Sequence, residues 1–416
     1  MRLIADLHIH SKYSRAVSKD MIPAVIAEFA LKKGVGLVGT GDFTHPEWVR
    51  ILESELEETP NGFAVLKGTT APLFTYTVEI SCIYSKGGAT RRIHQVVVAP
   101  TLEVVKRINT ALAQIGNLKA DGRPILGCDA KEIVRIATEA SPEAFVIPAH
   151  AWTPWFSLFG SQSGFDSLKD CYEEQTERIS AIETGLSSDP PMNWRLSQLD
   201  TVQIVSFSDA HSARKMGREA TVFELAKPTY ANLLAALRKP TADNRVAETI
   251  EFFPEEGKYH WDGHRSCGVR WSPSETAKHK ALCPKCGKRV TVGVMHRVDK
   301  LADRPAGYAP GDRPGFRSLI PLDEIIADAL GVKGATKKVL EQYDAIVKGV
   351  GSEFTALLDA APEQLKAVTL PRIAEGILRV REGKVDIRPG YDGVFGTIRV
   401  FKGGEKGTPS GQKTLF

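Results

Sequence analysis

The sequence lacks long hydrophobic runs and has little cysteine. No stretch of about 18 apolar residues occurs, so we expect no membrane-spanning helix. The opening MRLIADLHIH turns polar after one basic residue, which is not typical of a secretory signal. We therefore expect a cytoplasmic protein without a membrane partner. Six cysteines among 416 residues are too few to predict a disulfide framework.

The net charge is also small, only +4 at pH 7, but the cations are unevenly distributed. The segment from Glu256 to Arg317 holds 13 Lys and Arg against 6 Asp and Glu. A basic segment beside a near-neutral body suits a polyanion such as nucleic acid. A solvated linker would have the same composition, so charge alone does not decide between the two.

Composition and periodicity predict several domains. Residues 1–250 alternate β-branched runs with helical patterns, which predicts an α/β fold with a mostly parallel sheet or a (β/α) barrel. The expected strands are Leu3–His8, Val35–Thr40, Phe74–Ile80, Ile93–Val98, Ala144–Ile147, Ala181–Glu183 and Gln203–Phe207. Residues 251–318 form the basic segment, and 319–385 show helical periodicity. Residues 386–416 are expected to be a tail with a final strand that returns to the first domain.

Histidines and carboxylates recur near the ends of these strands. His8 and His10 lie two residues apart, as do Asp209 and His211, and a spacing of two places both side chains on one face of a strand. The other candidates are Asp42, His45, Glu79, His94 and His150. Each alone could be a hydrogen-bonded structural residue. Together they predict a site for two or three divalent metals, because mixed imidazole and carboxylate ligands suit zinc, manganese or iron.

The motifs around these residues carry a family resemblance. DLHIHS (6–11), GTGDFTH (39–45), VIPAH (146–150) and FSDAH (207–211) resemble the motifs of the PHP superfamily of phosphoesterases. The resemblance implies a distorted (β/α)7 barrel and a trinuclear cluster of zinc, magnesium or manganese. The ligands it implies are His8, His10, Glu79, His94, His150, Asp209 and His211. Among these, Glu79, His150, Asp209 and His211 are the predicted catalytic residues.

This sequence departs from the superfamily pattern in two places. Asp42 is followed by Phe43 where the pattern has histidine, so both Asp42 and His45 are kept as candidate ligands. A histidine that many members carry shortly after the first motif is missing from residues 11–19. The occupancy of one metal position is therefore open.

A second metal motif lies in the basic segment. His264 and Cys267, then fifteen residues, then Cys283 and Cys286 form two short pairs typical of a structural zinc ribbon, although His260 or His279 could replace His264. Cations around the pairs are candidate contacts for DNA phosphates: Arg265, Arg270, Lys285, Lys288 and Arg289. Trp261 and Trp271 could stack on bases, or could simply cover the small ribbon.

The helical region contains a weaker signal. Gly331 and Gly334 separate two helical patterns, and such a helix-G-x-x-G-helix element can hold a phosphate at a helix start, with Lys333 beside it. Two glycines between helices are also the ordinary way to end one helix and begin another. The element therefore predicts a DNA contact only in combination with the other features.

The order of these parts, together with residues 152–167, 183–194 and 293–305, resembles the endonuclease Q family nearly from end to end. The resemblance implies a metal-dependent endodeoxyribonuclease for DNA repair, which cuts the phosphodiester 5′ to uracil, hypoxanthine, xanthine or an abasic site. A sliding clamp is a further candidate partner. Two alternatives remain: a small-molecule phosphatase with the same metals, and a non-catalytic DNA-binding protein.

Overall fold

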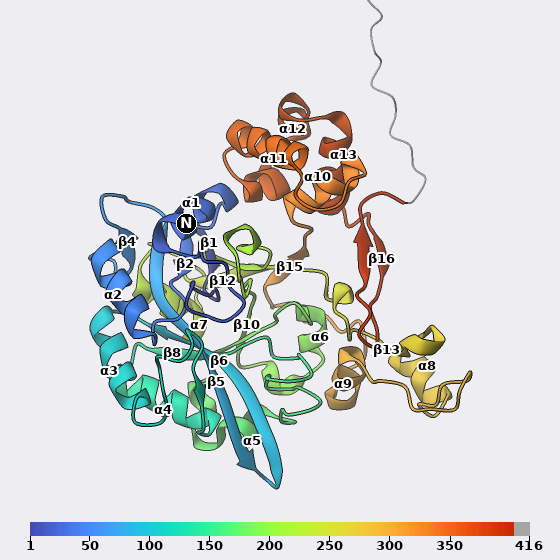
Figure 1. Ribbon diagram of the computed structural model, residues 1–416, viewed down its shortest axis with the longest axis horizontal. Coiled ribbons are helices and arrows are strands. Elements are labelled where there is room, and N and C mark those ends of the chain that lie inside the picture. Colours follow the sequence, from blue (N-terminus) through green and yellow to red (C-terminus); the bar gives the residue numbers. More distant parts are fainter. Residues whose placement is uncertain (403–416) are drawn as a thin grey trace, which may run out of the picture.

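An eleven-stranded mixed sheet forms the centre of the computed structural model, which describes residues 1–402 (Figure 1). Its strands are β1 (Arg2–Asp6), β2 (Leu37–Gly39), β3 (Leu56–Glu58), β4 (Ala64–Leu66), β5 (Leu73–Lys86), β6 (Ala89–Ala99), β7 (Ile125–Leu126), β8 (Phe145–Pro148), β11 (Ala220–Glu224), β12 (Arg245–Glu251) and β15 (Gly315–Ser318). The path runs β15–β12–β11–β1–β2–β5–β4–β3, with β6 and β7 on β5 and β8 on β6. The α/β class predicted from the sequence is confirmed.

The sheet is less parallel than the sequence predicts. β5 and β6 form a long antiparallel hairpin, and β1 pairs antiparallel with β11. The hairpin turns at Gly87 and Gly88, whose φ angles of 61° and 73° suit a tight reversal that residues with a Cβ adopt poorly. β9 (Ala181–Glu183) and β10 (Gln203–Val205) pair only with each other in the described strands. These pairings do not establish a closed barrel, which stays a prediction.

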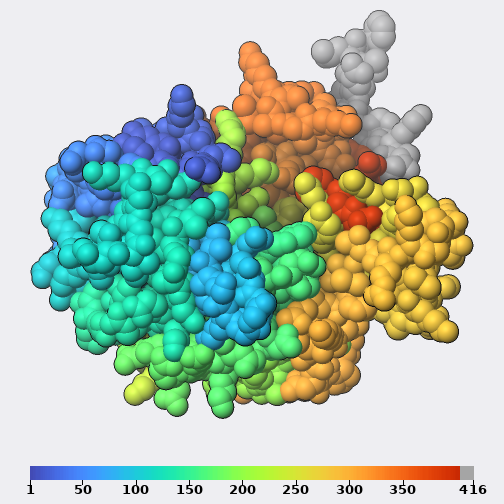
Figure 2. All heavy atoms as spheres, turned by 60° about the horizontal axis from the view of Figure 1, so that its bottom comes forward, coloured from blue at the N-terminus to red at the C-terminus, as the bar shows by residue number. Residues whose placement is uncertain are grey.

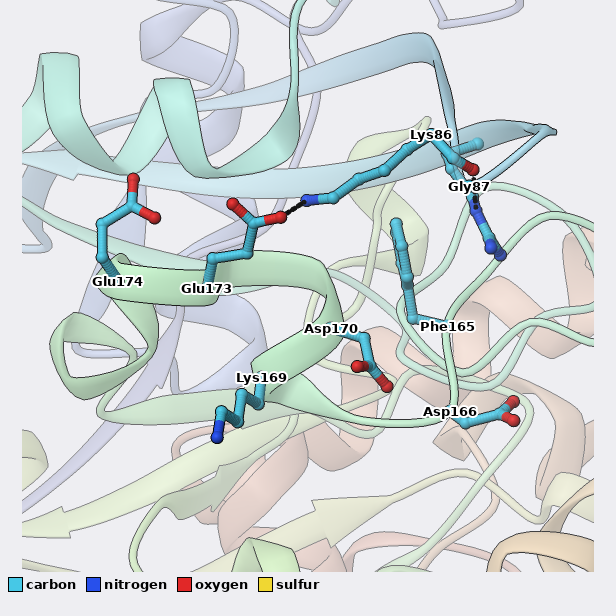
Figure 3. Close-up of a pocket in the computed structure, with 9 residues that line it drawn as sticks. Lys86, Gly87, Phe165, Asp166, Lys169, Asp170, Glu173 and Glu174 are labelled. Carbon is cyan, nitrogen blue, oxygen red and sulfur yellow. Dashed lines mark hydrogen bonds and ion pairs between the residues drawn. The ribbon is translucent and has the colours of Figure 1, made fainter.

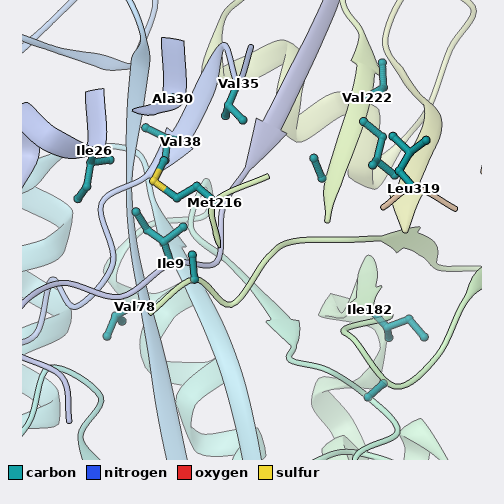
Figure 4. Packing of buried hydrophobic residues seen from close by; sticks show 14 of the residues in the cluster. Ile9, Ile26, Ala30, Val35, Val38, Val78, Ile182, Met216, Val222 and Leu319 are labelled. Atoms are coloured by element: carbon teal, nitrogen blue, oxygen red, sulfur yellow. The ribbon is translucent and has the colours of Figure 1, made fainter. Parts of the chain in front are cut away.

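Helices flank the sheet and bury their apolar faces against it: α1 (Pro23–Lys33), α2 (Pro46–Glu55), α3 (Leu102–Leu112), α4 (Ala130–Ala140) and α7 (Tyr230–Arg238). Thr101 and Asp129 cap α3 and α4 by accepting backbone N–H groups, which satisfies donors that the first turn leaves free. Ile9, Val38 and Met216 meet in the core beneath the strand ends (Figure 4). Within residues 1–402, no helix combines the length and apolarity needed to cross a bilayer.

Apart from β15, which joins the central sheet, the basic segment folds as a small unit beside it. It contains β13 (Asp262–His264), β14 (Val269–Trp271), α8 (Pro273–Lys278) and α9 (Val294–Leu301). Its own apolar cluster has only Val269, Cys283 and Val290 as buried members. So small a core does not supply much stability on its own, which makes a bound metal a reasonable source of the rest.

The C-terminal segment is helical, as its periodicity predicts. It contains α10 (Leu322–Leu330), α11 (Lys337–Val350), α12 (Pro362–Val368) and α13 (Pro371–Arg381), and Gly331 ends α10 at φ 66°. A buried ion pair attaches it to α1: Lys33 Nζ lies 2.6 Å from Glu353 Oε2, and both side chains are 5% exposed. The Tyr343 hydroxyl donates to the same carboxylate at 2.7 Å.

The chain then returns to the basic segment through a hairpin of β16 (Asp386–Arg388) and β17 (Thr397–Arg399). Asp392 in its loop accepts the backbone N–H of Arg265 at 2.7 Å and the hydroxyl of Thr291 at 2.6 Å. Figure 2 shows the red hairpin against the yellow basic segment. Residues 403–416 of the predicted tail lie outside the described residues. The division at residues 250, 318 and 385 stays a prediction.

Candidate metal centre

The side chains that the sequence predicts as metal ligands come mainly from strand ends. His8 and His10 follow β1, His150 follows β8 and Asp209 follows β10, while Glu79 and His94 lie within β5 and β6. Their ligand atoms form two groups, each with all atoms within 4.8 Å of one another. The first group is His8, His10, Glu79 and Asp209, and the second is Glu79, His94 and His150.

Glu79 belongs to both groups because its two carboxylate oxygens face opposite sides. Oε2 lies 3.2 Å from His10 Nε2 and 3.6 Å from His8 Nε2. Oε1 lies 2.6 Å from His94 Nδ1 and 3.0 Å from His150 Nε2. A carboxylate with one oxygen in each group can bridge two cations, as in two-metal sites for phosphoryl chemistry.

One buried nitrogen indicates that the residues fit a metal. His8 is 1% exposed, and its Nε2 has no hydrogen-bond partner among residues 1–402. The same atom lies 3.6 Å from a carboxylate oxygen of Glu79 and 3.6 Å from one of Asp209. An unpaired buried nitrogen costs free energy unless a ligand satisfies it. Imidazole and carboxylate donors around such a point are the chemistry of zinc, manganese and magnesium sites.

Acidic and basic side chains in the cluster stabilise one another's charged forms. Burial disfavours the ionised carboxyl of Glu79, but the charges of His94 and His8 hold its pKa well below the ordinary value. Burial likewise disfavours a charged His8, yet Glu183 and Asp209 hold the pKa of this imidazole well above its usual range. The two shifts belong to one interaction, because each buried carboxylate favours a charged imidazole beside it and each charged imidazole favours an ionised carboxylate.

Sequence reasoning missed Glu183 as part of this site. Its carboxylate accepts a hydrogen bond from His8 Nδ1 at 2.9 Å and from the backbone N–H of His150 at 2.7 Å. Glu183 is fully buried and ends β9. A carboxylate on the far nitrogen of a ligating histidine fixes its tautomer and leaves the other nitrogen free to bind metal. The signal was present, because Glu183 ends an expected strand as other candidates do.

Three predicted ligands lie outside the two groups. Asp42 lies behind His10, 3.1 Å from its Nδ1, and also accepts hydrogen bonds from the hydroxyls of Ser11 and Ser14. The ring of His45 stacks on Tyr13 at 4.2 Å between centroids. His211 packs against the ring of His10 at 4.7 Å. Asp42 and His211 therefore touch a member of the first group, whereas in the described part of the chain no side-chain hydrogen bond, ion pair or ring contact joins His45 to either group.

Three residues of the site have strained backbone conformations. Asp42, His150 and Asp209 have φ angles of 50°, 30° and 48°, which residues with a Cβ adopt rarely. Such conformations cost about 1–3 kcal/mol each and persist where the surroundings enforce them, often at functional sites. Arg218 contributes to this enforcement, because its Nε donates to the carbonyl of Ser208 at 2.8 Å.

An aromatic loop borders the second group. The ring of Phe156 lies 4.8 Å from that of His94, and Trp155 beside it is 42% exposed. Arg297 of α9 holds the far part of this loop, since its guanidinium donates to the carbonyls of Phe159 at 2.8 Å and Phe165 at 2.9 Å. The basic segment therefore positions a loop of the metal centre.

The four predicted ribbon ligands come together. The ligand atoms of His264, Cys267, Cys283 and Cys286 lie within 4.8 Å of one another, with Cys286 Sγ 3.4 Å from His264 Nδ1. His279 instead stacks on Trp271 at 4.3 Å, and His260 is buried elsewhere. Three thiols and one imidazole suit a closed tetrahedral zinc site.

The cations predicted to contact DNA are exposed: Arg265, Arg270, Lys285, Lys288, Arg289 and Lys333. Within residues 1–402, none of these six side chains forms an ion pair with a carboxylate. Arg270 lies over the ring of Trp261 at 5.7 Å, and Lys285 donates to a carbonyl of Cys267 at 2.7 Å. Their charge therefore remains available to an anionic partner.

A surface hollow of about 790 Å³ lies away from these residues, at the end of the β5–β6 hairpin (Figure 3). Its lining includes Lys86, Phe165 and Glu173, and Lys86 Nζ lies 2.8 Å from Glu173 Oε1. No candidate metal ligand lines it. Because it contains no candidate metal ligand, it does not compete with the metal centre as a functional site.

Solved structures of similar proteins identify the family. A lesion-specific endonuclease Q from Pyrococcus furiosus matches with a TM-score of 0.85 and 34% identity, over 96% of this chain and 95% of that one. The chain belongs to the endonuclease Q family. A second endonuclease Q structure, a complex with a 27-mer duplex substrate with an abasic lesion at the active site, matches with a TM-score of 0.83 and 34% identity, over 97% of each chain.

Sequence comparisons also find similar proteins in two further organisms. Protein YqxK of Bacillus subtilis is 30% identical over 414 residues, which cover 96% of this chain and 99% of that protein. Protein MJ0043 of Methanocaldococcus jannaschii is 32% identical over 252 residues, but this chain spans only 31% of its length. Two family profiles match parts of the chain: PHP-associated over residues 198–241, and MJ0043 C-terminal domain over residues 321–384.

Proposed function

We propose that this protein is a metal-dependent endodeoxyribonuclease that cleaves DNA on the 5′ side of deaminated bases and abasic sites. The observation that carries the proposal is the pair of buried His and carboxylate groups that share Glu79. Membership of the endonuclease Q family supports the same reaction class, and one solved relative holds a duplex with an abasic lesion at its active site.

The chain's residues would divide the chemistry as follows. Divalent ions held by the two groups would lower the pKa of water and neutralise charge on the phosphate, as two-metal sites do. Glu183 keeps the proton of His8 on Nδ1, so that Nε2 faces the centre. Asp42 does the same for His10 by accepting from its Nδ1 at 3.1 Å. These contacts fix the centre before substrate arrives, which avoids a cost of reorganisation.

Duplex DNA would lie across the basic segment. Lys288 and Arg289 are exposed and form no ion pair within residues 1–402, and phosphate neutralisation by such cations supplies most of the sequence-independent affinity. Figure 2 shows a recess between the N-terminal body, the orange helical segment and the yellow basic segment. DNA held by the basic segment would therefore pass close to the body that carries the metal centre.

The damaged nucleotide would be extruded from the duplex, because a stacked base hides the edge that distinguishes it. We place its pocket between loops 152–167 and 184–194. Trp152 Nε1 donates to Asn193 Oδ1 at 2.8 Å and so ties the two loops together. Uracil and hypoxanthine both present a carbonyl beside an N–H, which one set of backbone groups can recognise.

We also propose that the central sheet closes as a distorted barrel, with residues 1–250, 251–318 and 319–385 as separate domains. Isolated backbone hydrogen bonds between strand ends support closure of this barrel, although these ends do not pair along their length. The backbone N–H of His10 donates to Ala210 O at 3.0 Å, and that of Ala151 to Glu183 O at 3.0 Å. These bonds connect the end of β1 with that of β10, and the end of β8 with β9.

The decisive experiment compares matched duplexes that carry uracil, hypoxanthine, an abasic site, cytosine or adenine at one position, each with Mn²⁺ and with EDTA. We expect metal-dependent cutting of the first three only, because cytosine and adenine place an amino donor where a carbonyl acceptor is needed. Two unmatched buried contacts at about 1–3 kcal/mol each amount to roughly 30-fold selectivity or more.

Three results would contradict the proposal. Equal cutting of all five duplexes would indicate a non-specific nuclease. Hydrolysis of a small phosphomonoester without cutting of any duplex would favour the phosphatase alternative. Binding of the duplexes without cutting at any metal concentration would favour a non-catalytic DNA-binding protein.

A further inference from the structure

Arg123 reaches the metal centre from a loop that sequence reasoning left without a role. Its Nη1 donates to Glu79 Oε2 at 3.0 Å, and its side chain is 29% exposed whereas that of Glu79 is fully buried. Within residues 1–402, Arg123 is the only Lys or Arg whose side chain forms an ion pair with a carboxylate of the two metal groups. The guanidinium thus extends from solvent to the shared carboxylate.

The loop is built to hold this position. The backbone N–H of Gly122 donates to Tyr13 O at 3.0 Å, and the hydroxyl of Thr44 donates to Gly122 O at 3.2 Å. A Cβ at Gly122 would lie 2.3 Å from Asp42 Oδ2, so only glycine allows this approach. Asp121 accepts the backbone N–H of Arg123 at 3.1 Å. These contacts hold the backbone from which the Arg123 side chain extends.

The guanidinium has unused binding capacity. Of its five N–H donors, the described chain pairs only the one directed at Glu79. A planar guanidinium matches two oxygens of a phosphate, and this geometry makes arginine the usual residue for binding phosphate at a fixed angle. Partly exposed donors beside a buried cluster of candidate metal ligands are where a substrate phosphate would arrive.

We propose that Arg123 is a catalytic residue that binds a non-bridging oxygen of the scissile phosphodiester and stabilises the negative charge that develops on it. This inference rests on the proposed function, because it takes a phosphodiester as the substrate. A purely structural role is the alternative, in which Arg123 only orients Glu79. In the catalytic role Arg123 contributes to phosphate binding, whereas in the structural role it contributes to metal binding.

The test uses the full-length protein with Arg123→Gln, Arg123→Lys and the control Arg107→Gln. Arg107 lies on the surface of α3, 54% exposed and 4.0 Å from Glu103. Four quantities are measured: the affinity for Mn²⁺ by calorimetry, the affinity of the Mn²⁺-loaded protein for inorganic phosphate, and the rates of hydrolysis of bis(p-nitrophenyl) phosphate and of an abasic duplex.

For Arg123→Gln we expect both rates to fall by about 100- to 1000-fold, the usual loss when one donor to a developing oxyanion is removed. Phosphate should bind at least about tenfold more weakly, while Mn²⁺ affinity should stay near that of the wild type. Arg123→Lys should recover part of the loss in rate and part of the loss in phosphate affinity, because lysine keeps the positive charge but lacks the paired N–H donors of the guanidinium. Arg107→Gln should match the wild type.

A fall in Mn²⁺ affinity that parallels the fall in rate would overturn the proposal and make Arg123 a positioning residue for Glu79. Unchanged phosphate binding would overturn it as well. The proposed function has a separate outcome: a wild type that hydrolyses the small diester but not the abasic duplex would refute the lesion endonuclease alone. If it hydrolyses neither, the phosphate affinities still decide the role of Arg123.

Discussion

Replacing Glu183 with glutamine should weaken metal binding although Glu183 belongs to neither metal group. Glu183 now accepts from His8 Nδ1 and from the backbone N–H of His150, so both of its contacts require an acceptor. Glutamine has one oxygen and one NH₂ group. When its oxygen accepts from His150, its NH₂ faces His8 Nδ1, and that nitrogen must then be the unprotonated one. The proton moves to Nε2, the atom that faces Glu79 and Asp209.

The size of the effect follows from these contacts. Loss of a carboxylate behind a ligating histidine costs about 10- to 100-fold in metal affinity, or about 1.4 to 2.7 kcal/mol. Glu183→Ala should cost more, because it leaves two buried donors unpaired at about 1–3 kcal/mol each. Glutamine has nearly the same side-chain volume as glutamate, so the effect of Glu183→Gln reports the change in the tautomer of His8. Titration calorimetry with Mn²⁺ measures the loss directly.

Glu177→Gln is the matched control, since Glu177 is exposed and lies in the same part of the chain. It should bind Mn²⁺ as the wild type does, and circular dichroism should show that all variants are folded. Wild-type Mn²⁺ affinity in Glu183→Gln would refute the reasoning, because it would mean that the tautomer of His8 does not govern the centre.

Three further changes test other parts of the structure. Asp209→Asn should abolish cleavage without unfolding, because the amide keeps the shape of the carboxylate but not its charge; wild-type turnover under saturating Mn²⁺ would exclude Asp209 from the site. Cys283→Ser with Cys286→Ser should release zinc in elemental analysis and weaken DNA binding more than Mn²⁺ binding; unchanged zinc content would rule out the ribbon site. Lys33→Met should lower the free energy of unfolding in urea by about 3–5 kcal/mol, because it leaves the buried carboxylate of Glu353 without its cation. A loss below about 1 kcal/mol would show that Tyr343 and the backbone suffice.

Much of the candidate centre could be predicted because its signals are local. The spacing of two between His8 and His10 places both side chains on one face of a strand whatever the rest of the chain does. Glu79 was also predicted from a local feature, its place near the end of an expected strand. The signal for the ribbon is equally local, since His264 and Cys267 lie only a few residues apart in the sequence.

The remaining features depend on contacts between distant segments. Arg123 lies in a loop without any periodic pattern, and its partner Glu79 is 44 residues away. His45 follows a turn at Asp42, and only the geometry of that turn directs its ring toward Tyr13 rather than the centre. The antiparallel β5–β6 hairpin was missed although two adjacent glycines between β-rich runs are a sign of such a turn.

The contact of Asp392 with Arg265 and Thr291 has a consequence for the order in which the protein is made. Chain synthesis proceeds from the N-terminus, so the ribbon pairs leave the ribosome well before Asp392 does. The ribbon can take up zinc at that stage, but its contacts with the last hairpin form only when residue 392 has been added. These contacts of the basic segment are therefore among the last to form in the biosynthesis of the protein.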